Sequence, residues 1–441
     1  MKNFLLIHLL VLLLIYSSSY AQNDFAVKWM HSSSGIESDF VGNIQIDEDA
    51  NVYLTESTDD TLQVQIEESE FIVKGFSAIS KYNKEGTKVW SFPVWSSKNL
   101  DLSELYYSSM NKLIITGTFE KDLTLNKTKI EGDGQQMFIA MLDKSGKIEW
   151  IKNYRGKFLN KHLPVSANEN MIAVGGTFNH YLELDSITLL TGYNSNSFVI
   201  LLNHEGEETS SFQYTSKSNN QINDVLVFNR NIYSTGCFEN QVLLGDTTLI
   251  SEGRQDGYVH LISLDTVHNQ SLRIGGEYDD SGELLKLHNN NILVSGVFST
   301  DIKLLDDSSL GSNGMNDIYL LSLSYHGDIN WGDAIGGKSN DYVKDMIIND
   351  KNDIFLYGSF RGAIKKYNYT IESNMFSYDL FLSKYDSTGE FQYLISAGDS
   401  TTELARSLVN VDTNSIIISA NILNSNEIFG ETLDSIHNED Y

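Results

Sequence analysis

Short stretches of alternating apolar and polar residues, separated by clusters of turn-forming residues, recur along the whole chain. Residues 331–393 show the plan most clearly, with two pairs of such stretches, each pair joined by an Asx- or Gly-containing turn. Alternation with a period of two predicts strands, and a short polar turn between two strands predicts a hairpin. The expected strands are Asp341 to Ile348, Ile354 to Phe360, Asp379 to Tyr385 and Glu390 to Ala397. Two successive hairpins predict a four-stranded antiparallel sheet.

The same plan repeats about every 60 residues, a period typical of solenoids, propellers and arrays. A glycine followed two places later by phenylalanine marks most copies. These pairs are Gly117/Phe119, Gly176/Phe178, Gly236/Phe238, Gly296/Phe298 and Gly358/Phe360. Four-stranded sheets repeated radially form a β-propeller, which leaves only short, protected edges. Counting periods from Trp29 predicts an all-β, seven-bladed β-propeller that occupies residues 22–441.

The two ends of the chain are expected to meet in the last blade. Phe25 to His31 has the character of an edge strand and precedes the first inner strand at Asp39 to Asp47, so we expect it to supply the outermost strand of that blade. Asp440 and Tyr441 match the start of a third strand. We therefore expect a last blade that lacks this strand, in a chain that is part of a longer protein or a truncated reading frame.

The first 21 residues predict a signal peptide. Lys2 provides a positive charge, Phe4 to Tyr16 is a short apolar run, and Ser19-Tyr20-Ala21 suits cleavage after Ala21. This run is too short to span a bilayer comfortably, and no later segment is long enough. We expect the mature chain to be secreted or displayed at the cell surface, without a transmembrane segment.

The net charge limits the classes of partner, and the single cysteine limits the covalent cross-links. The formal net charge of −28 argues against nucleic acid and anionic membrane surfaces, and favours cationic partners. The single cysteine, Cys237, excludes an internal disulfide. Its place in an expected strand predicts a buried, unreactive thiol.

Two segments carry a resemblance to a known family. Asn352-Asp-Ile-Phe-Leu-Tyr-Gly-Ser-Phe360 and Asp379-Leu-Phe-Leu-Ser-Lys-Tyr-Asp-Ser-Thr-Gly389 resemble the secreted bacterial seven-bladed β-propeller repeat, known as the SBBP-type repeat. The resemblance covers essentially all of the mature chain. It implies export and, often, membership in a larger surface protein. The resemblance is specific for the fold and says little about function, because the family is defined by its repeat and not by an active site.

Acidic residues recur just before the expected innermost strands. Counting 17 residues back from each repeat glycine, or from the residue in its place, reaches Asp39, Asp279, Asp341 and Glu403. An acidic arc at one mouth of the channel would hold a cation or a basic ligand. Alternatively, each carboxylate caps the turn into its own strand by accepting backbone N–H bonds. The sequence favours the capping interpretation and leaves both open.

Other chemistry is sparse. Trp95 lies off the period and is the aromatic candidate for contact with a ligand, whereas the periodic tryptophans and phenylalanines predict core packing. Residues 47–51 place oxygens at alternate positions, but the central glycine and final glutamate of a calcium loop are missing, which favours a turn over Ca²⁺. No nucleophile elbow, zincin pair or zinc-type spacing is present in the sequence, so we predict no catalytic residue and no cofactor, with Ca²⁺ as the alternative.

These observations predict an exported, non-catalytic, monomeric propeller that serves as a binding or scaffold module. Its partner would be a protein, a glycan or a cationic ligand. The alternative is the propeller portion of a larger secreted enzyme, a hydrolase or lyase, or of an adhesin whose C-terminal part is missing.

Overall fold

The structure is a computed structural model. It describes residues 7–16, 25–31, 39–66, 69–158, 161–265, 269–303, 309–398, 400–423, 427–428 and 431–432. Within these ranges the chain consists of strands, turns and irregular segments, and it contains no helix. The predicted all-β class is therefore confirmed.

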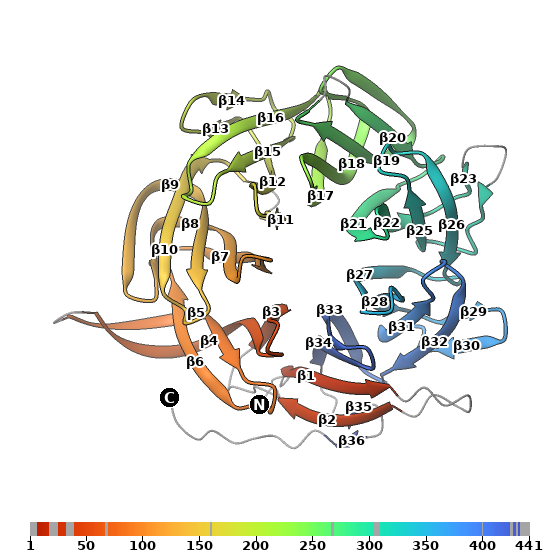
Figure 1. The fold of residues 1–441 in the computed structure, drawn as a ribbon, viewed down its shortest axis with the longest axis horizontal. Coiled ribbons are helices and arrows are strands. Elements are labelled where there is room, and N and C mark those ends of the chain that lie inside the picture. Colours follow the sequence, from red (N-terminus) through yellow and green to blue (C-terminus); the bar gives the residue numbers. More distant parts are fainter. Residues whose placement is uncertain are drawn as a thin grey trace. The chain divides into compact units, whose positions relative to one another are not determined.

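The chain divides into two compact units, and each is described by itself. One unit comprises residues 1–100, 122–131 and 344–441, and the other comprises residues 101–121 and 132–343. In both units the sheets are antiparallel and follow the same meander, in which consecutive strands, or strands separated by one small hairpin, lie side by side (Figure 1).

The first unit contains three such meanders. One comprises β3 (Asp39–Ile46), β4 (Val52–Ile66), β5 (Ser69–Tyr82) and β6 (Lys88–Trp95). Another comprises β27 (Asp341–Ile348), whose first residues belong to the second unit, with β28 (Ile354–Phe360), β31 (Asp379–Tyr385) and β32 (Phe391–Ala397). The third comprises β33 (Thr402–Asp412), β34 (Ser415–Leu423), β1 (Ile7–Tyr16) and β2 (Phe25–His31). Small hairpins are β29 (Ala363–Lys366) with β30 (Tyr369–Glu372), and β35 (Glu427–Ile428) with β36 (Glu431–Thr432).

The second unit repeats the meander. Its strands are β7 (Leu100–Tyr107), β8 (Lys112–Leu125), β9 (Thr128–Asp143) and β10 (Ile148–Gly156), then β11 (Val165–Ala167), β12 (Ile172–Phe178), β15 (Asn196–Leu202) and β16 (Glu208–Ser216). The first residue of β7, the end of β8 and the start of β9 belong to the first unit. Next come β17 (Asn220–Phe228), β18 (Asn231–Leu244), β19 (Thr247–Ser263) and β20 (Gln270–Ile274), then β21 (Ser281–His288), β22 (Asn291–Phe298), β25 (Asp317–Leu323) and β26 (Ile329–Ile335). Small hairpins are β13 (Tyr181–Glu183) with β14 (Thr188–Leu190), and β23 (Ile302–Lys303) with β24 (Ser309–Leu310).

The strands expected from the clearest repeat are confirmed. β27, β28 and β31 have the predicted bounds, and β32 begins at Phe391, one residue later than predicted. The four-stranded antiparallel plan of a single copy is therefore correct. The number of seven blades stays a prediction.

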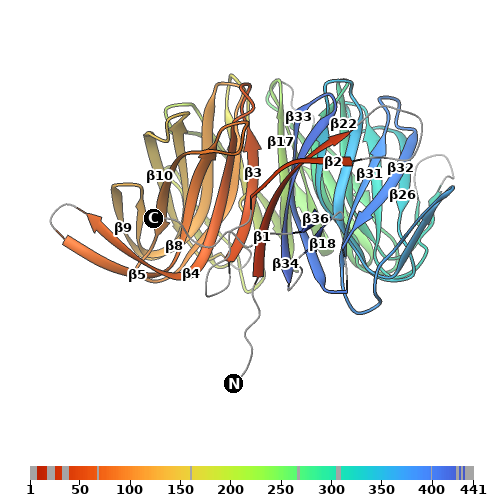
Figure 2. The same cartoon turned by 90° about the horizontal axis from the view of Figure 1, so that it is seen from below.

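The sheet that joins the two ends of the chain differs from expectation in one strand. β2 is its outermost strand, as predicted. The third place, expected to be empty, is taken by β1, in which Val11 pairs with Ser419 of β34 and with His31 of β2 (Figure 2). β1 lies within the residues expected to form a signal peptide, and that expectation stays a prediction. Asp440 and Tyr441 lie outside the described residues.

The glycine and phenylalanine of the repeat pack against an aromatic ring of the neighbouring strand. Four repeat glycines pair across the sheet with an aromatic residue of the third strand: Gly176 with Phe198, Gly236 with Tyr258, Gly296 with Tyr319, and Gly358 with Phe381. The phenylalanine two places later is buried and lies beside the same aromatic ring, with centroids 6.3 Å apart for Phe298 and Tyr319. Glycine leaves room for that ring, because a Cβ on Gly296 would lie 2.6 Å from the Tyr319 hydroxyl.

Candidate functional site

Asp341 and Glu403 stand at the beginnings of innermost strands, as the sequence predicted. Both side chains are fully buried. The Gly337 N–H donates to Asp341 Oδ2 at 2.7 Å, and the Thr401 hydroxyl donates to Glu403 Oε1 at 2.8 Å. Such contacts fit carboxyl groups that fix the turn before a strand. The two residues belong to different units, so the structure does not bring them together in one described site.

Asp279 does not occupy the predicted position, and its neighbour does. The Asp279 side chain is 58% exposed and lies 3.7 Å from Arg254. Asp280 is fully buried and accepts N–H bonds from Gly276 at 2.7 Å and Ser299 at 2.9 Å. The counting rule therefore missed the structural equivalent of Asp341 by one residue.

The reason for this one-residue error is the length of the hairpin turn. His288 pairs directly with Asn291, so only Asn289 and Asn290 form the turn, and both have positive φ values. In the equivalent turn after β27, Asn349 pairs with Asp353, so three residues (350–352) form the turn, one more than after β21. Two-residue turns favour asparagine because it tolerates this backbone conformation.

Of the other two candidates, Asp39 stays untested and Trp95 is buried. Asp39 begins β3, but its side chain lies outside the part that the structure describes. Trp95 was expected to be exposed, and this is wrong, because only 6% of it is accessible. The end of β6 pairs with the end of β8, with Trp95 opposite Thr124, and this extra strand pairing covers the position.

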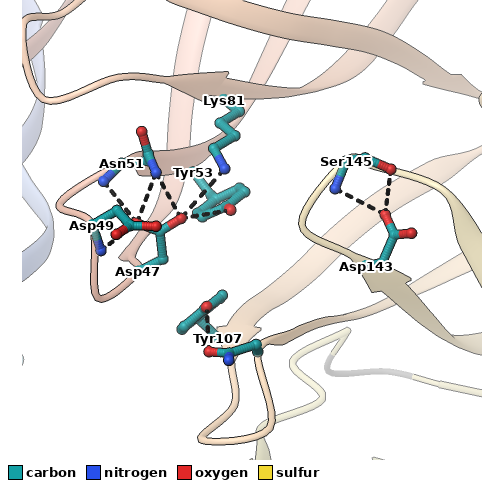
Figure 3. Close-up of polar contacts among 9 residues, drawn as sticks. Asp47, Asp49, Asn51, Tyr53, Lys81, Tyr107, Asp143 and Ser145 are labelled. Atoms are coloured by element: carbon teal, nitrogen blue, oxygen red, sulfur yellow. Dashed lines mark hydrogen bonds and ion pairs between the residues drawn. The ribbon is translucent and has the colours of Figure 1, made fainter.

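The segment weighed as a calcium loop forms a turn around Asp47. Its carboxylate accepts hydrogen bonds from the Asp49 N–H, from the backbone and side chain of Asn51, and from the Tyr53 hydroxyl at 2.9 Å (Figure 3). Lys81 Nζ lies 3.3 Å from Asp47 Oδ2. These neighbours are hydrogen-bond donors, which suit a carboxylate that caps a turn rather than one that shares a cation. Within the described ranges, no group of three or more His, Cys, Asp and Glu side chains is placed to hold a metal ion.

A second set of residues, which the sequence analysis missed, pairs with the acidic positions. We call them sheet-link pairs: two residues 24 positions apart. The first lies at the start of a third strand or, for Asp256, within β19 opposite Phe238, and the second lies within one residue of the start of the next first strand. They are Asn196/Asn220, Asp256/Asp280, Asp317/Asp341 and Asp379/Glu403. In each pair the backbone N–H of the second residue donates to the carbonyl oxygen just before the first, for example from Asp341 to Asn316 at 2.8 Å. The constant spacing of 24 is the sequence signal that would have found them.

Exposed apolar side chains lie on the loops that precede third strands. Tyr193 is 95% exposed before β15, Met315 is 54% exposed before β25, and Phe376 is 94% exposed before β31. Each stands two or three residues before its strand. These side chains are the apolar candidates for contact with a partner. These loops vary in sequence between copies, so the repeat pattern gives no signal for their exposed side chains.

The His260 imidazole and the Cys237 thiol, two groups that could act in catalysis, are buried in the core. His260 of β19 packs edge-on against the ring of Tyr214 with centroids 5.2 Å apart, and its Nδ1 lies 2.8 Å from the Ser271 hydroxyl. Burial lowers the pKa of His260 to about 4, so it is neutral at physiological pH. The predicted burial of Cys237 is confirmed, and burial, reinforced by Glu283, raises its pKa to about 12. Neither side chain is accessible to a substrate.

Comparisons with known proteins find likeness only among solved structures. No protein-family model matches the chain, and no curated protein matches it in sequence. The chain is similar to a protein of unknown function from Bacteroides caccae, with 11% identity, a TM-score of 0.34, and coverage of 72% of this chain and 89% of that one. It is also similar to the Pan2 WD40 domain of Neurospora crassa, with 9% identity, a TM-score of 0.42, and coverage of 89% and 91%. A Synechocystis apocarotenoid oxygenase mutant gives 8% identity, a TM-score of 0.39, and coverage of 80% and 70%.

At these identities and TM-scores, no function is transferred to the chain. The resemblance to SBBP-type repeats stays an expectation. A search of the described residues for helices able to cross a membrane finds none.

Proposed function

We propose that the chain is an exported seven-bladed β-propeller that acts as a non-catalytic binding or scaffold module. The observation that carries this proposal is that exposed apolar side chains lie on loops before third strands in each unit, with Tyr193 the most exposed in the second unit and Phe376 in the first. Binding residues concentrate on loops that a stable scaffold positions. The four-stranded meanders in both units support the propeller.

Tyr193→Ser and Phe376→Ser are expected to weaken ligand binding at least about tenfold each, since exposed aromatic anchors carry much of the energy of an interface. The wild-type chain is first screened against an array of glycans and against immobilised cationic proteins. The variants are then compared on any ligand found. Tyr325→Ser is the matched control, because Tyr325 is also exposed but lies on the turn after a third strand, at the opposite end of its sheet.

Equal weakening by all three variants would mean that the loops before the third strands are not the recognition surface. A chain that binds neither array would argue for a spacer without a ligand. The net charge of −28 favours the cationic ligands, and their binding should fall as salt concentration rises.

Export is tested separately. When the full gene is expressed in a bacterial host, we expect chain recovered outside the cytoplasm to begin at Gln22, because Ser19-Tyr20-Ala21 suits signal peptidase. Mass spectrometry of the intact chain measures its N-terminus. An exported chain that still carries residues 1–21 would contradict the predicted cleavage.

A further inference from the structure

Three of the sheet-link pairs bring two acidic side chains together in the protein interior. The members of the pairs Asp256/Asp280, Asp317/Asp341 and Asp379/Glu403 are all at most 5% exposed. Carboxylates are rarely buried this completely unless they are paired with a cation or are protonated. Burial of these carboxyl groups therefore requires a compensating cation, hydrogen bond or proton.

In each pair the two carboxyl groups lie against the same glycine turn. The Gly337 N–H donates to Asp341 Oδ2 at 2.7 Å, and Gly336 lies directly against the Asp317 carboxyl group. Gly398 shows the convergence most directly, because a Cβ placed on it would lie 2.5 Å from Asp379 Cγ and 2.6 Å from Glu403 Oε2. In the third pair the Gly276 N–H donates to Asp280 at 2.7 Å, and Gly275 lies against Asp256.

The first members of two pairs have one satisfied and one unsatisfied oxygen. Asp317 Oδ2 accepts the N–H of Asn313, and Asp256 Oδ2 accepts the N–H of Glu252 at 3.0 Å. The Oδ1 atom of each is buried and has no hydrogen-bond partner in the described part of the chain. A buried oxygen without a partner costs free energy, and two facing carboxylates resist ionising together.

The fourth sheet-link pair shows what the position requires. Asn196 and Asn220 occupy the same places with the same spacing, and Asn220 Nδ2 donates a hydrogen bond to Asn196 Oδ1 at 3.3 Å. Their backbones are linked like those of the acidic pairs, from the Asn220 N–H to the Ser195 carbonyl. Two amides supply the donor and the acceptor themselves. Two carboxyl groups make the equivalent bond only when one of them carries a proton.

We propose that each acidic sheet-link pair binds one proton from solvent and shares it as an O–H···O hydrogen bond between its two carboxyl groups. The proton supplies the donor that the unsatisfied oxygen lacks and removes one of the two facing charges. The link between consecutive sheets is then strongest when the pair is singly protonated. This property is independent of what the loops bind.

Asp317/Asp341 is the clearest case, because of the charges around it. Within the described residues Asp317 makes no ion pair, and Lys338 in the loop before Asp341 is exposed. At Asp256/Asp280, by contrast, Arg273 contacts Asp256 at 2.6 Å and also binds Glu252, while Asp279 and Arg254 lie beside them at the surface. We therefore expect the stability of the sheet link at Asp317/Asp341 to depend more on the shared proton than that at Asp256/Asp280.

The direction of the pH dependence follows from the raised pKa values. Burial raises the pKa of Asp317 to about 6, and burial together with the charges of Asp256 and Asp279 raises that of Asp280 to about 6. A carboxyl group whose folded pKa exceeds its unfolded value adds stability that is fully present below the unfolded pKa. That stability is lost as pH rises through the folded pKa. Asp317 and Asp280 therefore weaken the fold progressively as pH rises from about 4 through about 6.

The test copies the natural amide pair into the acidic position. In the full chain, the double variant Asp317→Asn with Asp341→Asn is expected to melt at least about 2 °C above wild type near pH 8, where the wild-type pair has lost its proton. The gap is expected to close near about pH 5, where the wild-type pair is protonated. Asp386→Asn is the control, because Asp386 caps an exposed turn, and it should give no rise at pH 8.

Infrared spectroscopy provides a second readout that does not depend on the variant's stability. A carbonyl stretching band of a buried protonated carboxyl group should persist in wild type and in Asp386→Asn at about pH 5.5, above the range in which exposed carboxyl groups titrate. It should be weaker in the double variant. Should the double variant fail to fold, the wild-type band still decides the matter, since its absence at this pH would overturn the proposal.

Two melting results would also overturn it. One is a double variant that melts at or below the wild-type temperature at both pH values. The other is wild-type melting that rises when Ca²⁺ is added and falls with a chelator while the double variant responds to neither. That second result would mean that the pair holds a cation instead of a proton.

Discussion

Asp47→Ala is expected to lower the free energy of unfolding by about 3–5 kcal/mol at neutral pH, because it leaves a buried ammonium group without its carboxylate. Lys81 is 8% exposed, and its Nζ lies 3.3 Å from Asp47 Oδ2. The variant also removes the acceptor for the Asn51 backbone and the Tyr53 hydroxyl. Urea unfolding followed by circular dichroism measures the difference.

The cost of Asp47→Ala should depend on pH. Burial, the largest single influence, acts to raise the pKa of Asp47, but the hydrogen bonds from Asn51 and Tyr53 and the charge of Lys81 outweigh it and hold the pKa below its usual value. Such a group contributes stability above its unfolded pKa and loses it as pH falls through the folded pKa. The difference between wild type and variant should therefore shrink below about pH 4.

Two variants separate the ion pair from the turn. Asp143 caps a similar but exposed turn, where it accepts the Ser145 N–H at 2.8 Å (Figure 3), so Asp143→Ala should cost only about 1 kcal/mol. Asp47→Asn should fall between the two, because Asn349 holds the equivalent turn in another sheet with an amide oxygen. If Asp47→Ala costs no more than Asp143→Ala, Lys81 does not depend on this carboxylate.

Gly296→Ala is expected to lower the free energy of unfolding by about 2–3 kcal/mol through overpacking. The added methyl group would lie far inside contact distance of the Ser281 carbonyl oxygen and 2.6 Å from the Tyr319 hydroxyl. The Ser281 oxygen belongs to the backbone of a neighbouring strand and cannot rotate away. Thermal unfolding of the purified variant measures the effect.

Gly192→Ala is the matched control for this substitution. Gly192 lies on an exposed loop, and a Cβ there meets no atom within 4 Å, so its replacement should change stability by less than about 0.5 kcal/mol. Tyr319→Phe in the Gly296→Ala background should restore only part of the loss, since the backbone contact remains. Equal melting of Gly296→Ala and Gly192→Ala would contradict the close packing of β21 against β22.

The strands could be predicted from the sequence because their determinants are local. Alternation and turn chemistry placed β27, β28 and β31 at their observed bounds. The pairing of β2 as an outermost strand followed from the order of copies along the chain. The entry of β1 into the same sheet did not follow, because its ten residues read equally well as an apolar run without a partner.

The candidate site was less predictable, because it depends on contacts between distant residues. A hairpin turn shorter by one residue moved the buried position from Asp279 to Asp280, and turn length varies freely between copies. Trp95 is covered by a strand pairing with Thr124 that no repeat count contains. The acidic partner Asp317 was visible in the sequence, but only coordinates reveal that its Oδ1 lacks a donor.

If residues 1–21 are a signal peptide, the pairing of β1 with β34 makes the order of cleavage and folding matter. Val11 and Ser419 are partners across the sheet although they lie roughly 400 positions apart in sequence, so this sheet is completed only after nearly the whole chain has been synthesised. If signal peptidase cuts after Ala21 first, the backbone of β34 is left with one open side, and β2 must pair elsewhere or move inward. If folding comes first, β1 is already paired with β34 and β2 when the peptidase acts, and the cut should be slower. Processing and folding would then compete for the same ten residues.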